Sequence, residues 1–219
     1  MQTSIDVKLT EYDLKLIEKD YDFYNKLITM FKDNKKVKLY NADILKFNLE
    51  KFVKKETIIF GNLPYNISSQ ILVKLVKFKK WPPNYTKLIL MFQKELAEKI
   101  IGKFASRNYG RISILANYRL KLIKKFLVSK NCFFPKPKIT SQIIHLCPKN
   151  FEKFSIKNLN NLEKVTNILF SNKRKMINKN IKKILNEKEI NKLKIKINLR
   201  PADLNPEIYY KISEVYENK

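Results

Sequence analysis

Thr57-Ile58-Ile59-Phe60-Gly61-Asn62-Leu63-Pro64-Tyr65 is the stretch around which the chain is organised. Its first four residues are β-branched or aromatic, as in a buried strand, and Gly61 closes the run. Beyond it, Ser68 can cap a helix whose apolar positions share one face, namely Ile71, Leu72, Leu75 and Val76. The tetrapeptide Asn62-Leu63-Pro64-Tyr65 is therefore predicted at the carboxyl end of a strand, where open α/β sheets bind their ligands.

The residue types in this tetrapeptide suggest a specific chemistry. An asparagine amide offers an acceptor and two donors, so Asn62 can orient an exocyclic amine. Pro64 fixes the turn, and the ring of Tyr65 can hold an extruded base by stacking. Together the four residues resemble the (N/D)PP(Y/F) signature of amino-directed S-adenosylmethionine methyltransferases. On these residues alone, a plain strand-ending turn is an equal alternative.

The charge balance of the chain indicates a polyanionic partner. The 219 residues include 46 Lys and Arg against 20 Asp and Glu, a formal net charge of +26 with a pI near 9.9. Residues 173–200 alone carry 11 basic and 2 acidic side chains. Phosphate contacts release counterions, so this distribution favours nucleic acid. The alternative is a solvated surface rich in lysine, as AT-rich coding sequence produces.

The cysteine and histidine residues of the chain do not suggest a metal site. Cys132 and Cys147 have neither metal-ligand spacing nor an even disulfide framework, which favours a reduced cytoplasm. The lone His145 lies in an alternating segment and is interpreted as structural. The chain has no signal-peptide core and no run of about 18 apolar residues. We therefore expect a cytoplasmic protein without a metal or a membrane partner.

Two acidic residues follow strands that are predicted ahead of the tetrapeptide. Leu14–Ile17 is predicted as a strand ending at Glu18, a helix follows as far as Phe31, and Val37–Tyr40 forms a further strand before Asp43. An acid at the first of these strand ends can accept both ribose hydroxyls of a nucleoside, and Asp43 could accept from an adenine amine. Either acid alone is more often a solvated strand end. Their position ahead of Asn62 favours the functional interpretation.

The remaining periodicity completes one sheet and adds a helical region. Lys87–Phe92 is a buried strand leading into a helix at Glu95–Ile101, and a further helix is predicted at Ile112–Tyr118. Strands around Leu120–Val128 and Thr140–Leu146 lack a helical crossover between them, so they should pair antiparallel. The predicted class is thus α/β, with a Rossmann-like, mostly parallel sheet and an antiparallel edge in residues 1–150.

Residues 151–219 are predicted as a small, basic, all-α RNA-binding domain after a linker at residues 148–153. One helix should carry an apolar face of Leu162, Val165, Ile168 and Leu169. A second should carry Ile177, Ile181, Ile184 and Leu185. The last begins with Asn205 as its cap and Pro206 at its first helical position.

Taken in order, the motifs resemble those of the KsgA-type rRNA adenine N6-dimethyltransferases from about Leu14 to the end of the chain. The resemblance is carried by Leu16-Ile17-Glu18-Lys19-Asp20, Asn41-Ala42-Asp43, Gly61-Asn62-Leu63-Pro64-Tyr65-Asn66-Ile67-Ser68, Met91-Phe92-Gln93-Lys94-Glu95, Tyr109-Gly110-Arg111, Phe133-Phe134-Pro135-Lys136-Pro137 and Phe170-Ser171-Asn172-Lys173-Arg174-Lys175. So many motifs in one order are highly specific.

The resemblance implies an enzyme that uses S-adenosylmethionine to dimethylate the N6 amines of two adjacent adenines near the 3′ end of small-subunit (16S-type) rRNA, in ribosome biogenesis. It implies catalytic roles for Asn62, Leu63, Pro64 and Tyr65. It implies cofactor contacts from Glu18 to the ribose, from Asp43 and Ile44 to the adenine, and from Asn62 at the reacting end, with no metal. It implies RNA contacts from Arg107, Arg111, Lys136, Lys173, Arg174 and Lys175. The expected form is a monomer acting on rRNA or on a pre-small-subunit particle.

The beginning of the chain departs from this family pattern. Family members start with a Gln-Asn-Phe-Leu segment, a central first strand and a Gly-x-Gly loop that holds the methionine end of the cofactor. Here the three glycines are Gly61, Gly102 and Gly110, and none precedes Glu18. Residues 5–9 alternate as a short strand would, but too few residues separate them from the next strand for a parallel crossover. We therefore expect an amino-terminally incomplete domain that lacks its first strand.

Three functions remain open at this point. The first is the dimethyltransferase. The second is a non-catalytic RNA-binding factor of ribosome assembly, or a truncated and inactive family member. A DNA adenine methyltransferase is disfavoured, because its resemblance would stop at the motif of Asn62 and would not extend from Phe133 to Lys175.

Overall fold

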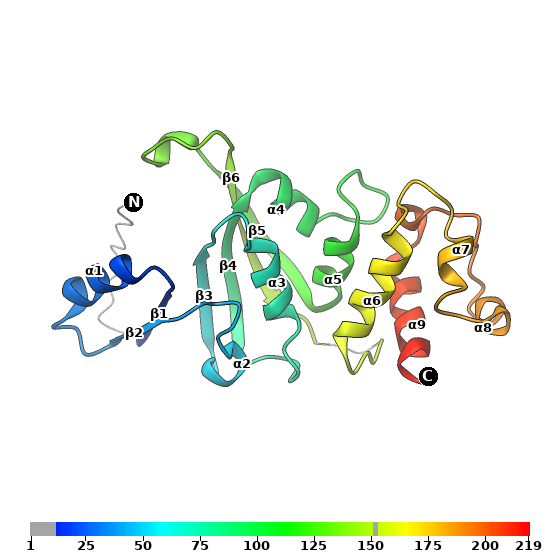
Figure 1. Cartoon of the computed structure of the whole chain (residues 1–219), viewed down its shortest axis with the longest axis horizontal. Helices are drawn as coiled ribbons and strands as arrows, with labels where there is room; N and C mark the ends of the chain where they lie inside the picture. The colour runs from blue at the N-terminus through cyan, green and yellow to red at the C-terminus, as the bar shows by residue number, and fades with distance from the viewer. Residues whose placement is uncertain (1–11, 151–152) are drawn as a thin grey trace.

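A computed structural model describes residues 12–150 and 153–219. The molecule is elongated (Figure 1), with a small two-stranded sheet at one end, a four-stranded sheet in the middle and a group of helices at the other end. The predicted strand at residues 5–9 lies outside the described residues. Within the described part, no helix has the length and apolar character that crossing a bilayer requires.

The smaller sheet joins two parallel strands through one helix. Strand β1 (Leu14–Glu18) leads into α1 (Tyr21–Phe31), and β2 (Val37–Asn41) returns beside β1. Asp20 begins α1 by accepting a hydrogen bond from the backbone of Phe23 at 2.8 Å. The predicted strands and helix are confirmed. The predicted apolar side of α1 is not buried, however, and its Met30 is 66% exposed.

The larger sheet has the strand order β3-β4-β6-β5. Strands β3 (Thr57–Asn62) and β4 (Tyr85–Gln93) are parallel, and β6 (Ser141–Pro148) runs antiparallel to both β4 and β5 (Leu120–Val128). The antiparallel pairing that we predicted for the last two strands is confirmed. The intervening elements are α2 (Leu49–Phe52), α3 (Ser68–Val76), α4 (Lys94–Ile100), α5 (Arg111–Arg119) and the short 3-10 helix η1 (Lys130–Cys132).

The strands of the expected sheet form two separate pieces. In the described part of the chain, neither β1 nor β3 has a hydrogen-bonded neighbour on its second side. Strands pair only about 4.8 Å apart, and no strand of the described residues joins β1 to β3. The division therefore falls between the two strands that carry Glu18 and Asn62 at their carboxyl ends.

The core lies on the face of the larger sheet that α3, α4 and α5 cover (Figure 1). Leu88, Leu90 and Phe92 alternate along β4 and are completely buried, as the period of two in a strand requires. On the opposite face of β3, Ile58 and Phe60 are 41% and 70% exposed. Among the described residues, the helices therefore cover β3 on one face and leave its other face exposed.

Helices α6 (Leu159–Phe170), α7 (Asn178–Ile181), α8 (Glu187–Lys192) and α9 (Pro206–Glu217), with the 3-10 helix η2 (Pro201–Asp203), form the carboxyl-terminal region. Asn205 caps α9 as predicted. The predicted second helix is wrong in its length, because α7 ends at Ile181 and the chain turns before Asn186 caps α8. Its apolar residues are nevertheless all buried: Ile177, Ile181, Ile184 and Leu185.

Two buried tyrosine hydroxyls tie the helical region to α5 and to the loop before it. Tyr109 Oη donates to the carbonyl of Leu204 at 2.9 Å, and Tyr210 Oη donates to the carbonyl of Ile114 at 3.3 Å. Burial raises the pKa of both phenols, because a charged phenolate would lose its hydration there. Both stay neutral donors at physiological pH. The domain boundary at residues 150/151 stays a prediction.

Candidate active site at the carboxyl end of β3

The tetrapeptide Asn62-Leu63-Pro64-Tyr65 lies where β3 ends and the turn to α3 begins. A Cβ atom on Gly61 would stand 2.6 Å from Leu63 Cδ2 and 2.9 Å from Leu90 Cδ2. Glycine at this position therefore lets the Leu63 side chain fold back against the sheet. Asn62 and Pro64 remain exposed, while Tyr65 is half-buried. The polar end of the motif thus faces solvent and its apolar side is anchored.

The turn is held by the first residues of α3. Ile67 occupies the cap position without a side-chain cap bond, and Ser68 is the first helical residue. The expectation that Ser68 caps the helix is wrong. Its completely buried hydroxyl donates instead to the carbonyl of Tyr65 at 3.1 Å. This bond fixes the backbone on which the tyrosine ring stands.

The phenol of Tyr65 has a partner far away in the sequence. Its oxygen lies 2.7 Å from the Oγ atom of Ser141, the first residue of β6. Ser141 is completely buried. The ring is therefore held at its outer end by the sheet and at its backbone by α3.

Two of the predicted cofactor residues are brought together by the smaller sheet. Glu18 ends β1 directly opposite Asn41 of β2, and the Asn41 side chain donates to the Glu18 carbonyl at 3.0 Å. One carboxylate oxygen of Glu18 accepts from the backbone of Asp20 at 2.8 Å. Asp43 follows two residues after Asn41, so both acids stand at one edge of this sheet.

The carboxylate of Asp43 has two partners. One oxygen accepts from the backbone of Leu45 at 2.9 Å, and the other lies 3.0 Å from Lys19 Nζ. The Leu45 hydrogen bond and the Lys19 cation hold the pKa of Asp43 below its usual range. Ile44, between Asp43 and Leu45, is half-buried against the core. The segment thus presents an ionised acceptor beside an apolar side chain.

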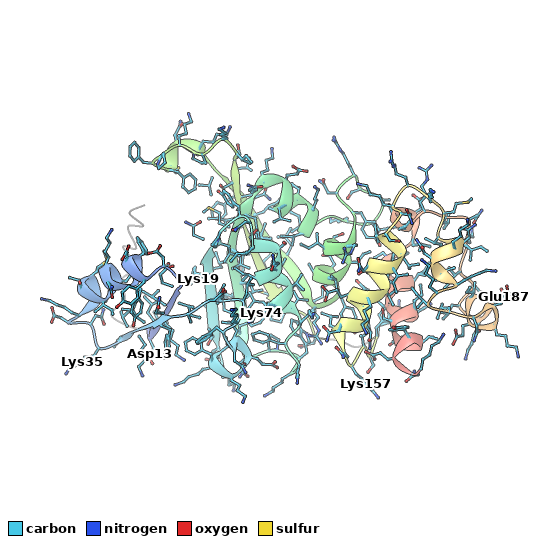
Figure 2. All side chains as sticks on the ribbon, viewed as in Figure 1. Asp13, Lys19, Lys35, Lys74, Lys157 and Glu187 are labelled. Carbon is cyan, nitrogen blue, oxygen red and sulfur yellow. The ribbon has the colours of Figure 1, made fainter. Side chains whose placement is uncertain are left out.

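One contact connects this segment with the helix that follows the tetrapeptide. Lys74 of α3 donates to the carbonyl of Leu45. Burial lowers the pKa of Lys74, and the nearby Asp43 carboxylate opposes that shift. Figure 2 shows Lys19 on the β1 side and Lys74 on α3. Among the described residues, Glu18 and Asn62 end strands of two separate sheets and no hydrogen bond joins them, so the structure does not bring these two predicted site residues into direct contact.

The predicted RNA-binding residues are all exposed and occupy three separate segments. Arg107 and Arg111 lie in the loop between α4 and α5 and at the start of α5. Gly102 shapes this loop, because a Cβ atom there would stand 2.4 Å from the carbonyl oxygen of Asn108. Lys136 lies on the turn between β5 and β6. Lys173-Arg174-Lys175 follow α6.

These segments lie on the same side of the molecule as the tetrapeptide. In Figure 1 the β5–β6 turn, the loop after α4 and the turn after α6 are all drawn along the upper side, where β3 and β4 also end. The β5–β6 arm, residues 120–140, contains six lysines and no acidic residue. At its tip Phe134 is 91% exposed. A polyanion laid along this side would meet positive charge on both flanks of the tetrapeptide.

The sequence did not predict the contacts by which four residues hold the site together: Lys19, Ser68, Lys74 and Ser141. Lys19 belongs to a quoted motif, but its ion pair with Asp43 depends on how β1 and β2 align. Ser141 begins a predicted strand, yet a single serine has no pattern that predicts a partner 76 residues away.

Histidine and cysteine form no cluster at this site. His145 Nε2 lies 3.6 Å from Cys147 Sγ on β6, and both side chains are half-buried. Cys132 and Cys147 are free thiols. The described residues hold no group of three potential metal ligands among His, Cys, Asp and Glu.

Comparison with known proteins identifies relatives of the whole chain. The family model described as ribosomal RNA adenine dimethylase matches residues 2–218. A Pelagibacter ubique protein, ribosomal RNA small subunit methyltransferase A, is 39% identical over 96% of this chain and 82% of its own length. The protein of that name from Prochlorococcus marinus is 34% identical over 94% of this chain and 79% of its own length.

Two solved structures with a similar fold also match nearly the full length of this chain. A dimethyladenosine transferase from Plasmodium falciparum matches 93% of this chain and 82% of that chain with a TM-score of 0.71 and 22% identity. The 23S rRNA methyltransferase ErmE matches 93% of this chain and 81% of that chain with a TM-score of 0.59 and 18% identity. At these identities the two structures support the methyltransferase-like α/β fold alone.

Proposed function

The chain belongs to the ribosomal RNA adenine dimethylase family, and from this premise we propose how its site works. The enzyme is an S-adenosylmethionine-dependent rRNA methyltransferase. It dimethylates the N6 amines of two adjacent adenines near the 3′ end of small-subunit rRNA during ribosome biogenesis. Its substrate is the rRNA or a pre-small-subunit particle, and it acts as a monomer in the cytoplasm.

The observation that supports this site is the arrangement at the end of β3. Asn62 is exposed three residues before Tyr65, whose backbone carbonyl is held by Ser68 and whose phenol oxygen is held by Ser141. An amide at an exposed strand end can accept hydrogen bonds from an amine. A fixed aromatic face beside it can hold the base that carries the amine. Together they supply the two functions that an extruded adenine needs.

The residues at the smaller sheet fit the nucleoside end of S-adenosylmethionine. The Glu18 carboxylate keeps one oxygen for a ribose hydroxyl after its bond to Asp20. Asp43 is ionised and Ile44 offers an apolar surface for the adenine ring. We assign Glu18, Asp43 and Ile44 to the ribose and adenine, and Asn62 to the end where the methyl group is transferred.

When bound, S-adenosylmethionine supplies an electrophilic methyl group. The Asn62 amide oxygen and the backbone oxygens of Leu63 and Pro64 accept hydrogen bonds from the target amine and orient its nitrogen lone pair. Tyr65 stacks on the adenine and keeps it out of the RNA stack. The N6 proton leaves to water after the transfer, so the site needs no general base with a shifted pKa. For the second transfer the monomethylated amine keeps one N–H, which it donates to one of these oxygens.

RNA affinity comes from the three basic segments that flank the tetrapeptide. We assign phosphate contacts to Arg107 and Arg111 on one flank, to Lys136 on the β5–β6 arm, and to Lys173-Arg174-Lys175 after α6. All six side chains are exposed. Contacts of this kind position the RNA without reading its sequence. The choice of base is therefore left to the contacts that Asn62 and Tyr65 make.

The proposal is tested by incubating the purified protein with small-subunit particles that lack this modification, with labelled S-adenosylmethionine. We expect label in N6,N6-dimethyladenosine at two adjacent positions near the 3′ end of the rRNA. Naked large-subunit rRNA is the control and should stay unlabelled. Tight binding to the particle without methyl transfer would favour the non-catalytic assembly factor instead.

A further inference from the structure

The environment of the Tyr65 hydroxyl is more constrained than stacking requires. A base can stack on any aromatic ring, so the phenol oxygen is not needed for the contact itself. Here that oxygen lies 2.7 Å from the hydroxyl of Ser141, which is completely buried. A hydroxyl buried without a partner would cost stability. Each of the two hydroxyls therefore supplies the partner that the other needs.

Ser141 is itself held firmly in place. It begins β6, with Gln93 of β4 opposite it on one side and Val128 of β5 opposite it on the other. Next to it, the backbone of Lys94 donates to the carbonyl of Thr140 at 2.9 Å. The Ser141 oxygen is therefore a fixed point on the sheet, against which the Tyr65 phenol on the turn is held.

We propose that Ser141 is a positioning residue for methyl transfer, which acts by holding the Tyr65 ring in the orientation that an extruded adenine must meet. The inference rests on the function proposed above and adds a residue to it. With the Tyr65 carbonyl held by Ser68 and the phenol held by Ser141, the backbone and the outer end of the ring are fixed before the base arrives. The enzyme thereby avoids ordering the ring during the reaction.

This role affects the rate more than the binding of RNA. Phosphate contacts dominate RNA affinity, and they lie on other segments. A loose ring would leave the target amine misplaced beside Asn62, and small misplacements are costly in rate. The second transfer is more sensitive, because the amine then already carries one methyl group and fewer orientations remain productive. Loss of the Ser141 hydroxyl should therefore lower kcat and increase the share of monomethylated product.

The test compares Ser141→Ala, Tyr65→Phe and the double variant on small-subunit particles. We expect kcat to fall roughly 5- to 50-fold in each single variant, as expected for a lost hydrogen bond and a misplaced base. The KM for the particle should change less than about twofold, since phosphate contacts persist. The double variant should be no slower than the slower single variant, because both changes remove one shared bond.

A matched control separates positioning from simple loss of a buried hydroxyl. Ser213 is also completely buried and donates one hydrogen bond to the carbonyl of Tyr209 at 2.8 Å, within α9. Ser213→Ala should lose similar stability without changing kcat or the ratio of monomethyl to dimethyl product. If Ser141→Ala behaves like Ser213→Ala in both readouts, the positioning role is refuted.

A second measurement does not depend on methyl transfer, so it tests the positioning role of Ser141 separately from the proposed function. In protein with isotope-labelled tyrosine, the NMR signal of the ring carbon that bears the hydroxyl reports its hydrogen bonding, and Tyr65→Phe assigns it. We expect Ser141→Ala to shift this signal and Ser213→Ala to leave it unchanged. An unshifted signal in Ser141→Ala overturns the inference. A shifted signal in a protein that shows no methyl transfer would overturn the proposed function, while the hydrogen bond between Tyr65 and Ser141 would still be supported.

Discussion

Lys19 Nζ lies 3.0 Å from an oxygen of Asp43, at the carboxyl ends of two neighbouring parallel strands. Lys19 is largely exposed, with 73% of its side-chain surface accessible. Exposed ion pairs contribute only about 0–1 kcal/mol, so an incoming ligand can displace this lysine at little cost. The pair, together with the Leu45 backbone hydrogen bond, therefore favours the ionised form of Asp43 without closing the position that we assign to the cofactor adenine.

Asp43→Asn should weaken S-adenosylmethionine binding about 10- to 100-fold, because a hydrogen bond to a charged acceptor contributes roughly 1.5–3 kcal/mol. Isothermal titration measures this directly. Lys19→Ala is the matched control and should change the affinity by less than about fivefold. Equal losses in the two variants would show that the ion pair, rather than the Asp43 acceptor, supports binding.

Tyr65→Ala should reduce kcat/KM for the rRNA by the value of one base stack, about 1–3 kcal/mol, or roughly 5- to 150-fold. Steady-state methylation of small-subunit particles gives the number. Tyr21 of α1 is a suitable control, since it is 66% exposed and α1 connects the strands of the other sheet. An unchanged kcat/KM for Tyr65→Ala would remove the stacking role from the mechanism.

Affinity for small-subunit rRNA should fall steeply with salt. A protein making 6 to 10 phosphate contacts loses roughly 10³ to 10⁵ in affinity between 50 and 200 mM. Reversing the charges of Arg174 and Lys175 together should weaken binding at every salt concentration without changing which base is modified. Filter binding across a salt series measures both effects.

Lys54 and Lys55 provide the control for that charge reversal. Both are exposed, and they precede the amino end of β3, opposite to the end that carries the tetrapeptide. Reversing them should change the affinity much less than reversing Arg174 and Lys175. A similar loss of affinity in the two charge-reversed variants, or an affinity that does not change with salt concentration, would contradict a defined RNA-binding surface.

Arg119 should be essential for the stability of the larger sheet. It is only 3% exposed, donates to the carbonyls of Val76 and Phe78 at 2.7 Å each, and lies over the ring of Trp81. Arg119→Leu leaves both buried carbonyls without that donor. We expect the free energy of unfolding in urea to fall by about 2–4 kcal/mol.

Arg111 begins the same helix but is exposed. Arg111→Leu should therefore change the free energy of unfolding by less than about 0.5 kcal/mol. If Arg119→Leu is as mild as this control, the buried guanidinium does not hold the end of α3 as we infer.

The elements of the fold could largely be predicted from the sequence, because each one leaves a local pattern. The strand predicted at Leu120–Val128 has those bounds in the structure, and the cap at Asn205 is correct. The early end of α7 could not be seen, because the apolar spacing from Ile177 to Leu185 is helical even though the chain turns after Ile181. The prediction that these apolar residues are buried was correct, whereas the prediction that they share one continuous helix was not.

The candidate site could be predicted only in part, for a related reason. Asn62 and Tyr65 carry a motif, and Glu18 and Asp43 follow strands, so their residue types and positions are visible in the sequence. The roles of Lys74 and Ser141 depend on where single side chains point after folding.

The most direct test of the central claim compares the protein with its Asn62→Ala variant on small-subunit particles. Methylated nucleosides are identified by mass spectrometry, and particle binding is measured alongside. The account predicts N6,N6-dimethyladenosine from the parent protein, none above background from Asn62→Ala, and nearly equal binding by both, because Asn62 acts on the amine and contacts no phosphate. Equal amounts of dimethyladenosine from the two proteins would contradict the assigned site.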